Sequence, residues 1–219
     1  MKILVFSDTH LSKFDLKKYQ LLKQIIHDSD RVIINGDFID DWLISGQEFI
    51  KSKWRLLFPL LLARQTVYIR GNHEKTITQK VAGHFSIKFC DSHEEYIKEK
   101  KFLFEHGDNI IKKNQFLFPK VNNKIIIHFR FLLRFFYFLE NSFNTLMPQL
   151  SKKFLRGEKQ NNILKNYYTD REFFLITGDT HNAELDLEKD FANTGKIMDG
   201  YASYILITNG DIKLVSTKY

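Results

Sequence analysis

The chain begins Met1-Lys2-Ile3-Leu4-Val5-Phe6-Ser7-Asp8-Thr9-His10, and this stretch decides the fold that the rest of the sequence indicates. Ile3 to Phe6 is a short apolar run, which is typical of a strand buried on both faces of a sheet. A carboxylate, Asp8, and an imidazole, His10, follow where that strand ends. Because ligands of α/β proteins bind at the carboxyl ends of such strands, this arrangement predicts a binding site there.

Four later segments repeat this design, each a short apolar run followed by polar groups that can bind a metal ion. They end in Gly36-Asp37, Gly71-Asn72-His73-Glu74, His106-Gly107-Asp108 and Gly178-Asp179-Thr180-His181. Carboxylate, amide and imidazole groups suit hard or borderline ions such as Mn²⁺, iron or Zn²⁺ better than thiolate-loving ions. The five strand ends together therefore predict one metal centre at one edge of a sheet.

Length and composition indicate one globular domain spanning residues 1–219. The chain has 219 residues, of which 43% are hydrophobic and 27% charged, and this argues against a disordered chain. A single cysteine, Cys90, excludes an intramolecular disulfide framework and suits a reducing compartment. The first apolar run is too short for a signal peptide, so we expect a cytoplasmic protein. The net charge of +7 suits a phosphate-rich partner, although many basic domains bind none.

Alternating strand and helix patterns predict an α/β fold with parallel strands. The helical spacing of apolar residues predicts helices over residues 13–28 and 48–64, each between two of the apolar runs. Asp40 and Asp41 either support the metal site from behind its ligands or form a helix N-cap, and we favour the N-cap. Asn209-Gly210, between two strand-like runs, predicts a tight hairpin near the end of the chain.

Residues 114–168 interrupt this pattern and are expected to form a helical insertion. Residues 125–147 are apolar and rich in phenylalanine. On a helix their polar side chains would form one narrow stripe, namely Arg130, Arg134, Tyr137, Asn141 and Asn144. Charges interrupt the apolar runs before they reach the ~20 residues of a membrane span. The insertion either packs on the core or forms a lid that holds lipid chains or rests on an anionic membrane surface, and the narrow stripe favours the lid. The basic residues show no pattern typical of nucleic-acid binding.

Taken in order, the motifs resemble those of the calcineurin-like metallophosphoesterase superfamily, which run Asp-x-His, Gly-Asp, Gly-Asn-His-Asp/Glu, His and Gly-His-x-His. The resemblance implies a layered β-sandwich flanked by helices and two divalent ions, with Mn²⁺ expected and iron or Zn²⁺ as alternatives. By this resemblance Asp8, His10 and His181 would hold one ion, Asn72 and His106 would hold the other, and the catalytic Asp37 would bridge both. His73 would be the catalytic residue that donates a proton or stabilises the transition state of phosphoester hydrolysis.

A narrower resemblance covers the turn at His106-Gly107-Asp108, the arginine-bearing insertion and the ending that follows Asn193-Thr194-Gly195. These features resemble UDP-2,3-diacylglucosamine pyrophosphohydrolases, which cleave a lipid-linked nucleotide diphosphate to UMP and a lipid monophosphate in lipid A synthesis. This resemblance implies a lid over acyl chains and a peripheral place on the inner face of the inner membrane. Arg130 and Arg134 would then either bind the diphosphate or face solvent.

Two departures from these patterns leave alternatives open. Asp179 stands where the superfamily has the first histidine of Gly-His-x-His, and this shorter, charged side chain is expected either to hold the second ion with a changed preference, to weaken that site or to inactivate it. Asn72 is followed by His73-Glu74, whereas many of the pyrophosphohydrolases have Arg-Asp there. The alternatives are therefore a soluble phosphodiesterase or phosphoprotein phosphatase, and a non-catalytic scaffold of the same fold.

Overall fold

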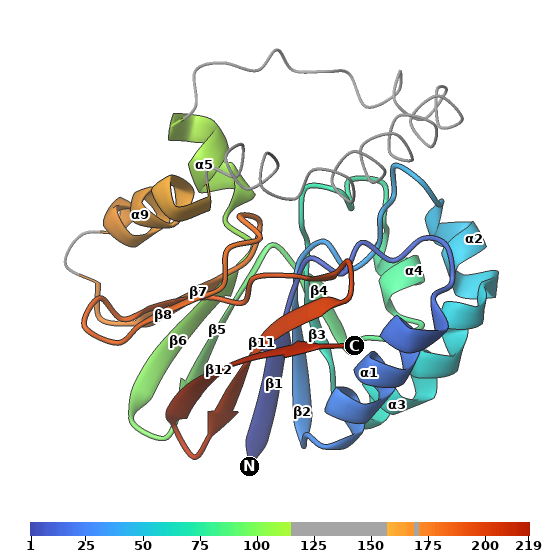
Figure 1. The fold of residues 1–219 in the computed structure, drawn as a ribbon, viewed down its shortest axis with the longest axis horizontal. Helices are drawn as coiled ribbons and strands as arrows, with labels where there is room; N and C mark the ends of the chain where they lie inside the picture. The colour runs from blue at the N-terminus through green and yellow to red at the C-terminus, as the bar shows by residue number, and fades with distance from the viewer. Residues whose placement is uncertain (115–156, 169–170) are drawn as a thin grey trace.

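A computed structural model describes residues 1–114, 157–168 and 171–219 of the chain (Figure 1). One sheet has seven strands in the order β10-β11-β1-β2-β3-β4, and β12 pairs with β11. Strands β1 to β4 are parallel to one another, whereas β11 is antiparallel to β1. The strand bounds are β1 (Lys2–Phe6), β2 (Arg31–Asn35), β3 (Val67–Ile69), β4 (Lys88–Cys90), β10 (Ile197–Met198), β11 (Tyr201–Thr208) and β12 (Asp211–Lys218).

The second sheet has five strands in the order β5-β6-β7-β9-β8. Its three central strands are parallel, and an antiparallel strand flanks them on each side. The strand bounds are β5 (Ser92–Ile97), β6 (Lys100–Glu105), β7 (Phe174–Thr177), β8 (Glu184–Asp186) and β9 (Phe191–Asn193). The five predicted apolar runs therefore divide between two sheets, so the expectation of a single sheet edge is wrong, while the predicted layered sandwich is confirmed.

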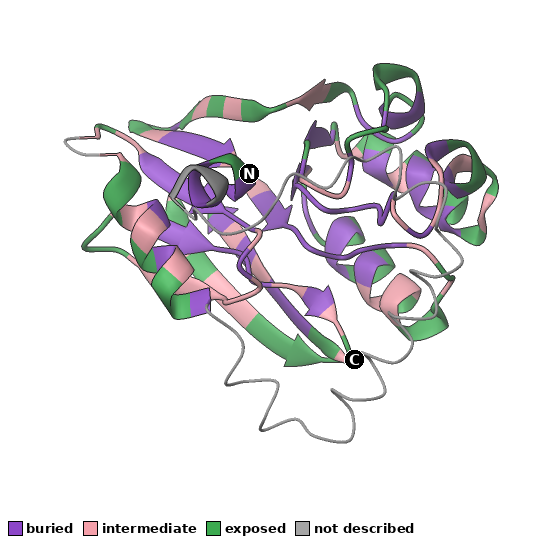
Figure 2. Cartoon of the chain, turned by 90° about the horizontal axis from the view of Figure 1, so that it is seen from above, coloured by how far each residue is buried: buried purple, intermediate pink, exposed green. Residues whose placement is uncertain are grey.

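The first strand shows why these runs are apolar throughout. Ile3 and Val5 join the core between the two sheets, together with Phe104 of β6 and Phe174 of β7. The intervening residues, Leu4 and Phe6, belong to a second core on the opposite face of their sheet, under the helices. Successive side chains of a strand point to opposite faces, so a strand covered on both sides carries apolar residues at every position. The buried segments in Figure 2 follow these two layers.

Helices cover the outer face of the first sheet, and their bounds correct one prediction. Helix α1 (Leu16–His27) confirms the helix expected over residues 13–28, and it begins after Asp15, whose side chain accepts hydrogen bonds from the Lys17 and Lys18 amides. The single helix expected over residues 48–64 is wrong. That stretch forms α2 (Gly46–Lys51), the 3₁₀ helix η1 (Lys53–Leu57) and α3 (Phe58–Ala63). Ser52 is extended and ends α2, and its side chain accepts a hydrogen bond from the Trp54 amide.

The remaining helices include one that ends where the predicted insertion over residues 114–168 begins and one that lies within the last part of that insertion. Helix α4 (Gln79–Ala82) lies on the same side of the first sheet as α1. Helices α5 (Asp108–Asn114) and α9 (Gly157–Tyr167) cover the second sheet (Figure 1). Most of the predicted insertion, with Arg130 and Arg134, lies outside the described residues. Within the described ranges, no helix has the length and apolar character needed to cross a membrane. The predicted hairpin at Asn209-Gly210 is confirmed, because β11 and β12 pair on either side of it.

Phe38 offers a test of the packing beneath the site. Its fully buried ring contacts four other aromatic rings with centroids 5.5 to 6.1 Å away, namely Phe6, Phe49, Tyr68 and Phe85. We expect Phe38→Ala to lower the free energy of unfolding by about 3–5 kcal/mol, because it leaves a cavity in this cluster. Urea unfolding measures the change. Tyr96→Ala, at a ring that is 71% exposed, is the control and should change stability by less than about 0.5 kcal/mol.

Candidate metal centre

The loops that follow the parallel strands of both sheets meet at one end of the sandwich. Asn35, the last residue of β2, joins the sheets there, since its side-chain amide donates hydrogen bonds to the carbonyls of Glu105 and Ile176, both at 3.0 Å. The backbone carbonyl of Asn35 in turn accepts a hydrogen bond from Nδ1 of His106 at 2.9 Å. Nε2 of His106 then faces the cluster, where it could bind a metal ion. Burial lowers the pKa of His106, but the carboxylates of Asp37, Asp8 and Asp179 raise it well above its usual value, so a bound ion would have to displace the Nε2 proton.

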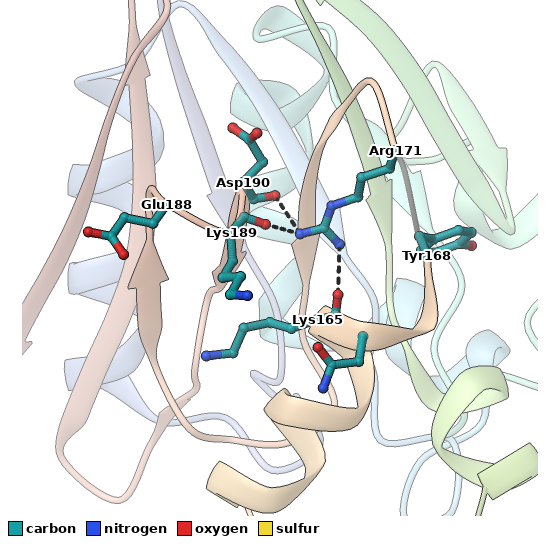
Figure 3. A pocket seen from close by; sticks show the side chains of 7 residues that line it. Lys165, Tyr168, Arg171, Glu188, Lys189 and Asp190 are labelled. Carbon is teal, nitrogen blue, oxygen red and sulfur yellow. Dashed lines mark hydrogen bonds between the residues drawn. The ribbon is translucent and has the colours of Figure 1, made fainter.

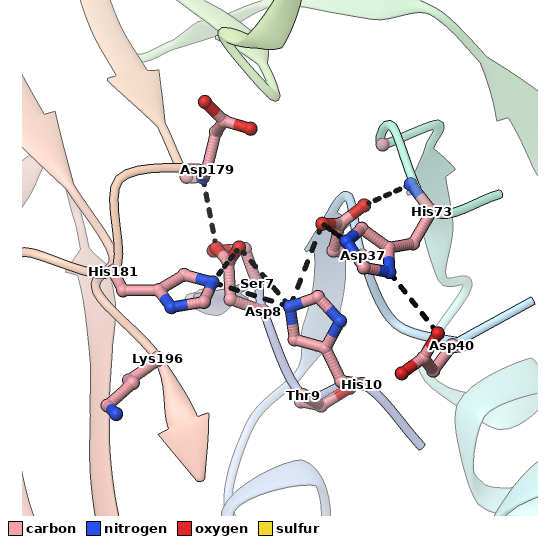
Figure 4. A network of polar contacts seen from close by, with 12 residues as sticks. Ser7, Asp8, Thr9, His10, Asp37, Asp40, His73, Asp179, His181 and Lys196 are labelled. Carbon is pink, nitrogen blue, oxygen red and sulfur yellow. Dashed lines mark hydrogen bonds and ion pairs between the residues drawn. The ribbon is translucent and has the colours of Figure 1, made fainter. Parts of the chain in front are cut away.

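One group of three possible ligands comes from the loops after β1 and β7. Oδ1 of Asp8 lies 3.2 Å from Nε2 of His181 and 3.9 Å from Nε2 of His10. The two imidazole Nε2 atoms are 3.4 Å apart (Figure 4). Burial, with repulsion from His73 and His181, lowers the pKa of His10 to about 4, so His10 is neutral at pH 7, as a metal ligand must be. The structure brings together three residues that the sequence placed around one ion.

Asp37 lies at the centre of a second group. Its Oδ2 atom is 3.4 Å from Nε2 of His106, 3.7 Å from Nε2 of His10 and 3.9 Å from Nε2 of His73. Oδ1 of Asp179 is 3.6 Å from the same His106 nitrogen. Asp37 therefore contacts both groups, and a single carboxylate can bridge two ions that are ~3.5–4 Å apart.

Three buried polar atoms show that the residues present fit divalent ions. Oδ1 of Asp8, Oδ1 of Asn72 and Nε2 of His106 are among the buried atoms that have no hydrogen-bond partner within the described part of the chain. Buried polar atoms normally have partners, and a missing one often indicates an ion. All three belong to residues that the sequence assigned as ligands. The buried carboxylates of Asp8 and Asp37 also require compensating positive charge, which divalent ions supply.

The backbone around the cluster is strained. Ten described non-glycine residues have a positive φ, and five of them are candidate ligands, namely Asp8, His10, Asp37, Asp179 and His181, with φ between 44° and 64°. A left-handed conformation costs a non-glycine residue on the order of 1–3 kcal/mol and persists where the surrounding structure enforces it. Such strain is concentrated at functional sites, which agrees with the clustering of ligand atoms.

Gly71 provides a direct test, because its backbone passes against Asp37. A Cβ atom at Gly71 would overlap Oδ1 and the backbone nitrogen of Asp37. We therefore expect Gly71→Ala to displace Asp37 and to weaken Mn²⁺ binding about ten-fold, measured by calorimetric titration. The control is Gly83→Ala, where the nearest atom to an added Cβ is the Gln79 carbonyl oxygen at 3.2 Å. Equal affinities in the two variants would contradict this arrangement of Asp37.

His73 is held beside the cluster by two side chains. Its Nδ1 atom donates a hydrogen bond to Oδ1 of Asp40 at 3.2 Å, and its ring stacks on Trp42 with centroids 3.9 Å apart. The N-cap interpretation of Asp40 and Asp41 is wrong: Ser45 caps α2, and Asp41 accepts a hydrogen bond from the Thr76 amide at 3.0 Å. Burial lowers the pKa of His73, but the carboxylates of Asp37 and Asp40 outweigh it, and the net shift is upward.

Glu74 is a supporting residue that the sequence reasoning missed. It is fully buried, and its carboxylate accepts hydrogen bonds from the amides of Asp37 at 3.1 Å, Ile39 at 2.9 Å and Gly71 at 2.7 Å. It thus joins the loop after β2 to the loop after β3. The available signal was its place in Gly71-Asn72-His73-Glu74, but the sequence does not reveal its three amide partners.

A pocket of about 370 Å³ lies elsewhere, between the end of α9 and the turn before β9 (Figure 3). Arg171 there donates hydrogen bonds to the carbonyls of Lys165, Lys189 and Asp190, and the Lys165 ammonium pairs with Glu184 and Asp186. Arg171 and Asp190 precede β7 and β9, so the pocket is at the amino ends of these strands. The ligand cluster is at their carboxyl ends, where α/β proteins place their sites.

The comparison with protein families identifies the family of the chain. Residues 1–167 match the family described as Calcineurin-like phosphoesterase. The chain belongs to this family. The α/β architecture with two sheets and flanking helices is the metallophosphoesterase fold that the sequence predicted. Membership in the calcineurin-like phosphoesterases supports phosphoester hydrolysis as the activity, and members of this family use divalent metals.

Solved structures with a similar fold include three that cover nearly all of this calcineurin-like phosphoesterase. An archaeal phosphodiesterase is 14% identical, covers 99% of this chain and 100% of its own, and has a TM-score of 0.49. YfcE, a phosphoesterase from E. coli, is 16% identical with 95% and 89% covered and a TM-score of 0.44. Vps29 from Chaetomium thermophilum is 12% identical with 100% and 96% covered and a TM-score of 0.45. No curated protein matches the sequence.

Proposed function

We propose that the chain is a dinuclear metal-dependent hydrolase of phosphate esters or diphosphates. The observation that carries this proposal is the position of Asp37, whose Oδ2 atom lies between the imidazoles of His10 and His106. In this proposal Asp8, His10, His181 and Asp37 would hold one ion. Asp37, Asn72, His106 and Asp179 would hold the other, with the carboxylate of Asp179 in place of the missing histidine.

The proposed mechanism assigns the remaining roles to residues of this chain. When bound, the two ions stabilise charge on the phosphoryl oxygens and lower the pKa of the attacking water. His73 holds a proton at Nε2, 3.9 Å from Asp37, and gives it to the leaving oxygen. Oδ1 of Asp40 accepts a hydrogen bond from Nδ1 of His73 and thereby fixes the orientation of the ring. Trp42 covers one face of the ring and limits its rotation.

For the substrate we propose a lipid-linked nucleotide diphosphate, UDP-2,3-diacylglucosamine, cleaved to UMP and a lipid monophosphate. The support is the sequence of residues 125–147, which on a helix would present an apolar surface with one narrow polar stripe, as suits acyl chains. Arg130 and Arg134 would bind the diphosphate, because guanidinium groups pair well with phosphate oxygens. The protein would then act in the cytoplasm, at the surface of an anionic membrane, with Mn²⁺ as the metal.

The experiment follows UMP release from UDP-2,3-diacylglucosamine by the full chain with Mn²⁺, beside hydrolysis of bis(4-nitrophenyl) phosphate. We expect the chain to release UMP from this substrate, and we expect chelation of the metal to abolish that release. Hydrolysis of the aryl ester alone would discard the lipid substrate and favour a soluble phosphodiesterase or phosphoprotein phosphatase. Co-sedimentation with anionic vesicles, with neutral vesicles as the control, tests the membrane surface separately.

The presence of Asp179 in place of a histidine ligand favours a second candidate function, that of a non-catalytic scaffold that keeps the fold. Burial, with repulsion from Asp8 and Asp37, raises the pKa of Asp179 to about 6, despite the attraction of His106. A carboxyl that is costly to ionise here would be a weaker ligand unless a bound ion offsets that cost. Metal analysis after reconstitution separates the candidates: two ions per chain are expected for the hydrolase, and clearly fewer than two would favour the scaffold.

A further inference from the structure

The buried stripe of α9 lies on the segments that carry three candidate ligands. Its buried residues are Gly157, Asn161 and Leu164, spaced by four and three positions along one face of the helix. A Cβ added at Gly107, the residue after His106, would lie 3.1 Å from a methyl group of Leu164. One added at Gly157 would lie 2.6 Å from Cβ of Asn182. Helix α9 therefore packs closely on the turn after His106 and on the loop after β7.

Asn161 is the polar member of this stripe, and its side-chain hydrogen bonds join α9 to the loop after β7 and to β8. Its side-chain amide nitrogen donates to the carbonyl of Asn182 at 3.0 Å and to Oε2 of Glu184 at 2.8 Å. Its side-chain oxygen accepts from the hydroxyl of Thr180 at 2.7 Å. Asn161 is fully buried, so each of these bonds would be costly to lose.

Thr180, whose hydroxyl donates to Asn161, lies between two strained candidate ligands. Thr180 separates Asp179, with a φ of 64°, from His181, with a φ of 56°. Left-handed residues revert to ordinary conformations unless neighbouring structure holds them. Within segment 179–182 the Thr180 hydroxyl also accepts a hydrogen bond from the Asn182 amide at 3.3 Å. Asn161 thus contacts this segment at the hydroxyl of Thr180 and at the carbonyl of Asn182.

We propose that Asn161 is a positioning residue of the metal centre, which fixes segment 179–182 so that Asp179 and His181 can bind ions. This inference rests on the proposed function, because it takes these two residues as ligands. Residues that orient metal ligands from behind typically contribute ten- to a hundred-fold to metal affinity. Asn161 has three directed hydrogen bonds through which to act.

The test is calorimetric titration of the chelator-stripped full chain with Mn²⁺. Asn161→Asp keeps the shape of the side chain but replaces its donor with an acceptor facing a carbonyl and a carboxylate. We expect it to weaken Mn²⁺ binding about ten- to a hundred-fold. Asn162→Asp adds the same charge at the next, exposed position of α9 and is expected to bind Mn²⁺ as the unaltered chain does. Thermal unfolding without metal is measured for both variants.

A second pair of variants decides the question if Asn161→Asp does not fold. Thr180→Val removes the hydroxyl that Asn161 accepts from, whereas Thr180→Ser keeps it. Weaker Mn²⁺ binding in the valine variant alone supports the proposal. Equal Mn²⁺ affinities within each pair, with only the unfolding temperature changed, would overturn it. An unaltered chain that binds no Mn²⁺ would overturn this inference and the proposed function together, whereas one that binds Mn²⁺ but hydrolyses nothing would overturn the function alone.

Discussion

Replacing Asp37 with alanine is expected to abolish turnover, with a loss of about a thousand-fold or more, because this carboxylate is proposed to serve both ions at once. Its Oδ2 atom is the one carboxylate oxygen within 4 Å of three imidazoles, those of His10, His73 and His106, among the described residues. Its Oδ1 atom also accepts the His73 amide hydrogen at 2.9 Å. Rates with bis(4-nitrophenyl) phosphate and Mn²⁺ measure the loss, and metal analysis should show fewer than two ions per chain.

The control for this variant is Asp91→Ala, at a side chain that is 78% exposed and pairs with Arg70 at 3.6 Å. It is expected to leave the rate and the metal content unchanged. An undiminished rate in Asp37→Ala would overturn the two-ion mechanism. A lost rate with both ions retained would instead place Asp37 in the chemical step without a bridging role, so the two measurements are needed together.

The strands and their polar ends could be predicted because their signals are local. Runs such as Ile3–Phe6 are apolar at every position, since both faces of the sheet are covered. Division into two sheets could not be predicted, because strand pairing is long-range: β1 pairs with β2 and also with β11, some 200 residues later. The missed break between α2 and α3 has a different cause. Ser52 ends α2 and caps the next helix because its backbone is extended, and residue type alone does not indicate that conformation.

The candidate site residues were identified by residue type and order, and the structure brings six candidate ligands and the candidate proton donor His73 together. The ligands are Asp8, His10, Asp37, His106, Asp179 and His181. The supporting residues escaped prediction because their chemistry is not that of a ligand. Glu74 acts on backbone amides, and Asp40 was assigned to a helix end because an aspartate after a turn is a common N-cap. Such roles depend on backbone geometry that residue types do not encode.

His73→Gln is expected to lower kcat about 10²–10⁴-fold, the usual contribution of a positioned proton donor. The rate of the unaltered chain should fall as pH rises through the pKa of His73, because the donor must be protonated. Burial lowers that pKa, but the carboxylates of Asp37 and Asp40 outweigh burial and raise it above its usual value, whereas bound divalent ions oppose the rise. The variant should therefore lose the alkaline decline of the pH profile. His84→Gln, at an exposed histidine, is the control.

Metal content determines how the His73→Gln result is read. His73, His10 and Asp37 also form a group whose atoms could hold an ion by themselves. If His73 is a proton donor, the variant keeps two Mn²⁺ per chain and its KM changes little, so the loss is confined to kcat. If His73 is a ligand, Mn²⁺ content falls with the rate. The hydrogen bond from Nδ1 to Asp40 suits either role, since an oriented imidazole with a free Nε2 can carry a proton or bind a metal. The stoichiometry therefore separates two roles that the geometry of His73 permits equally.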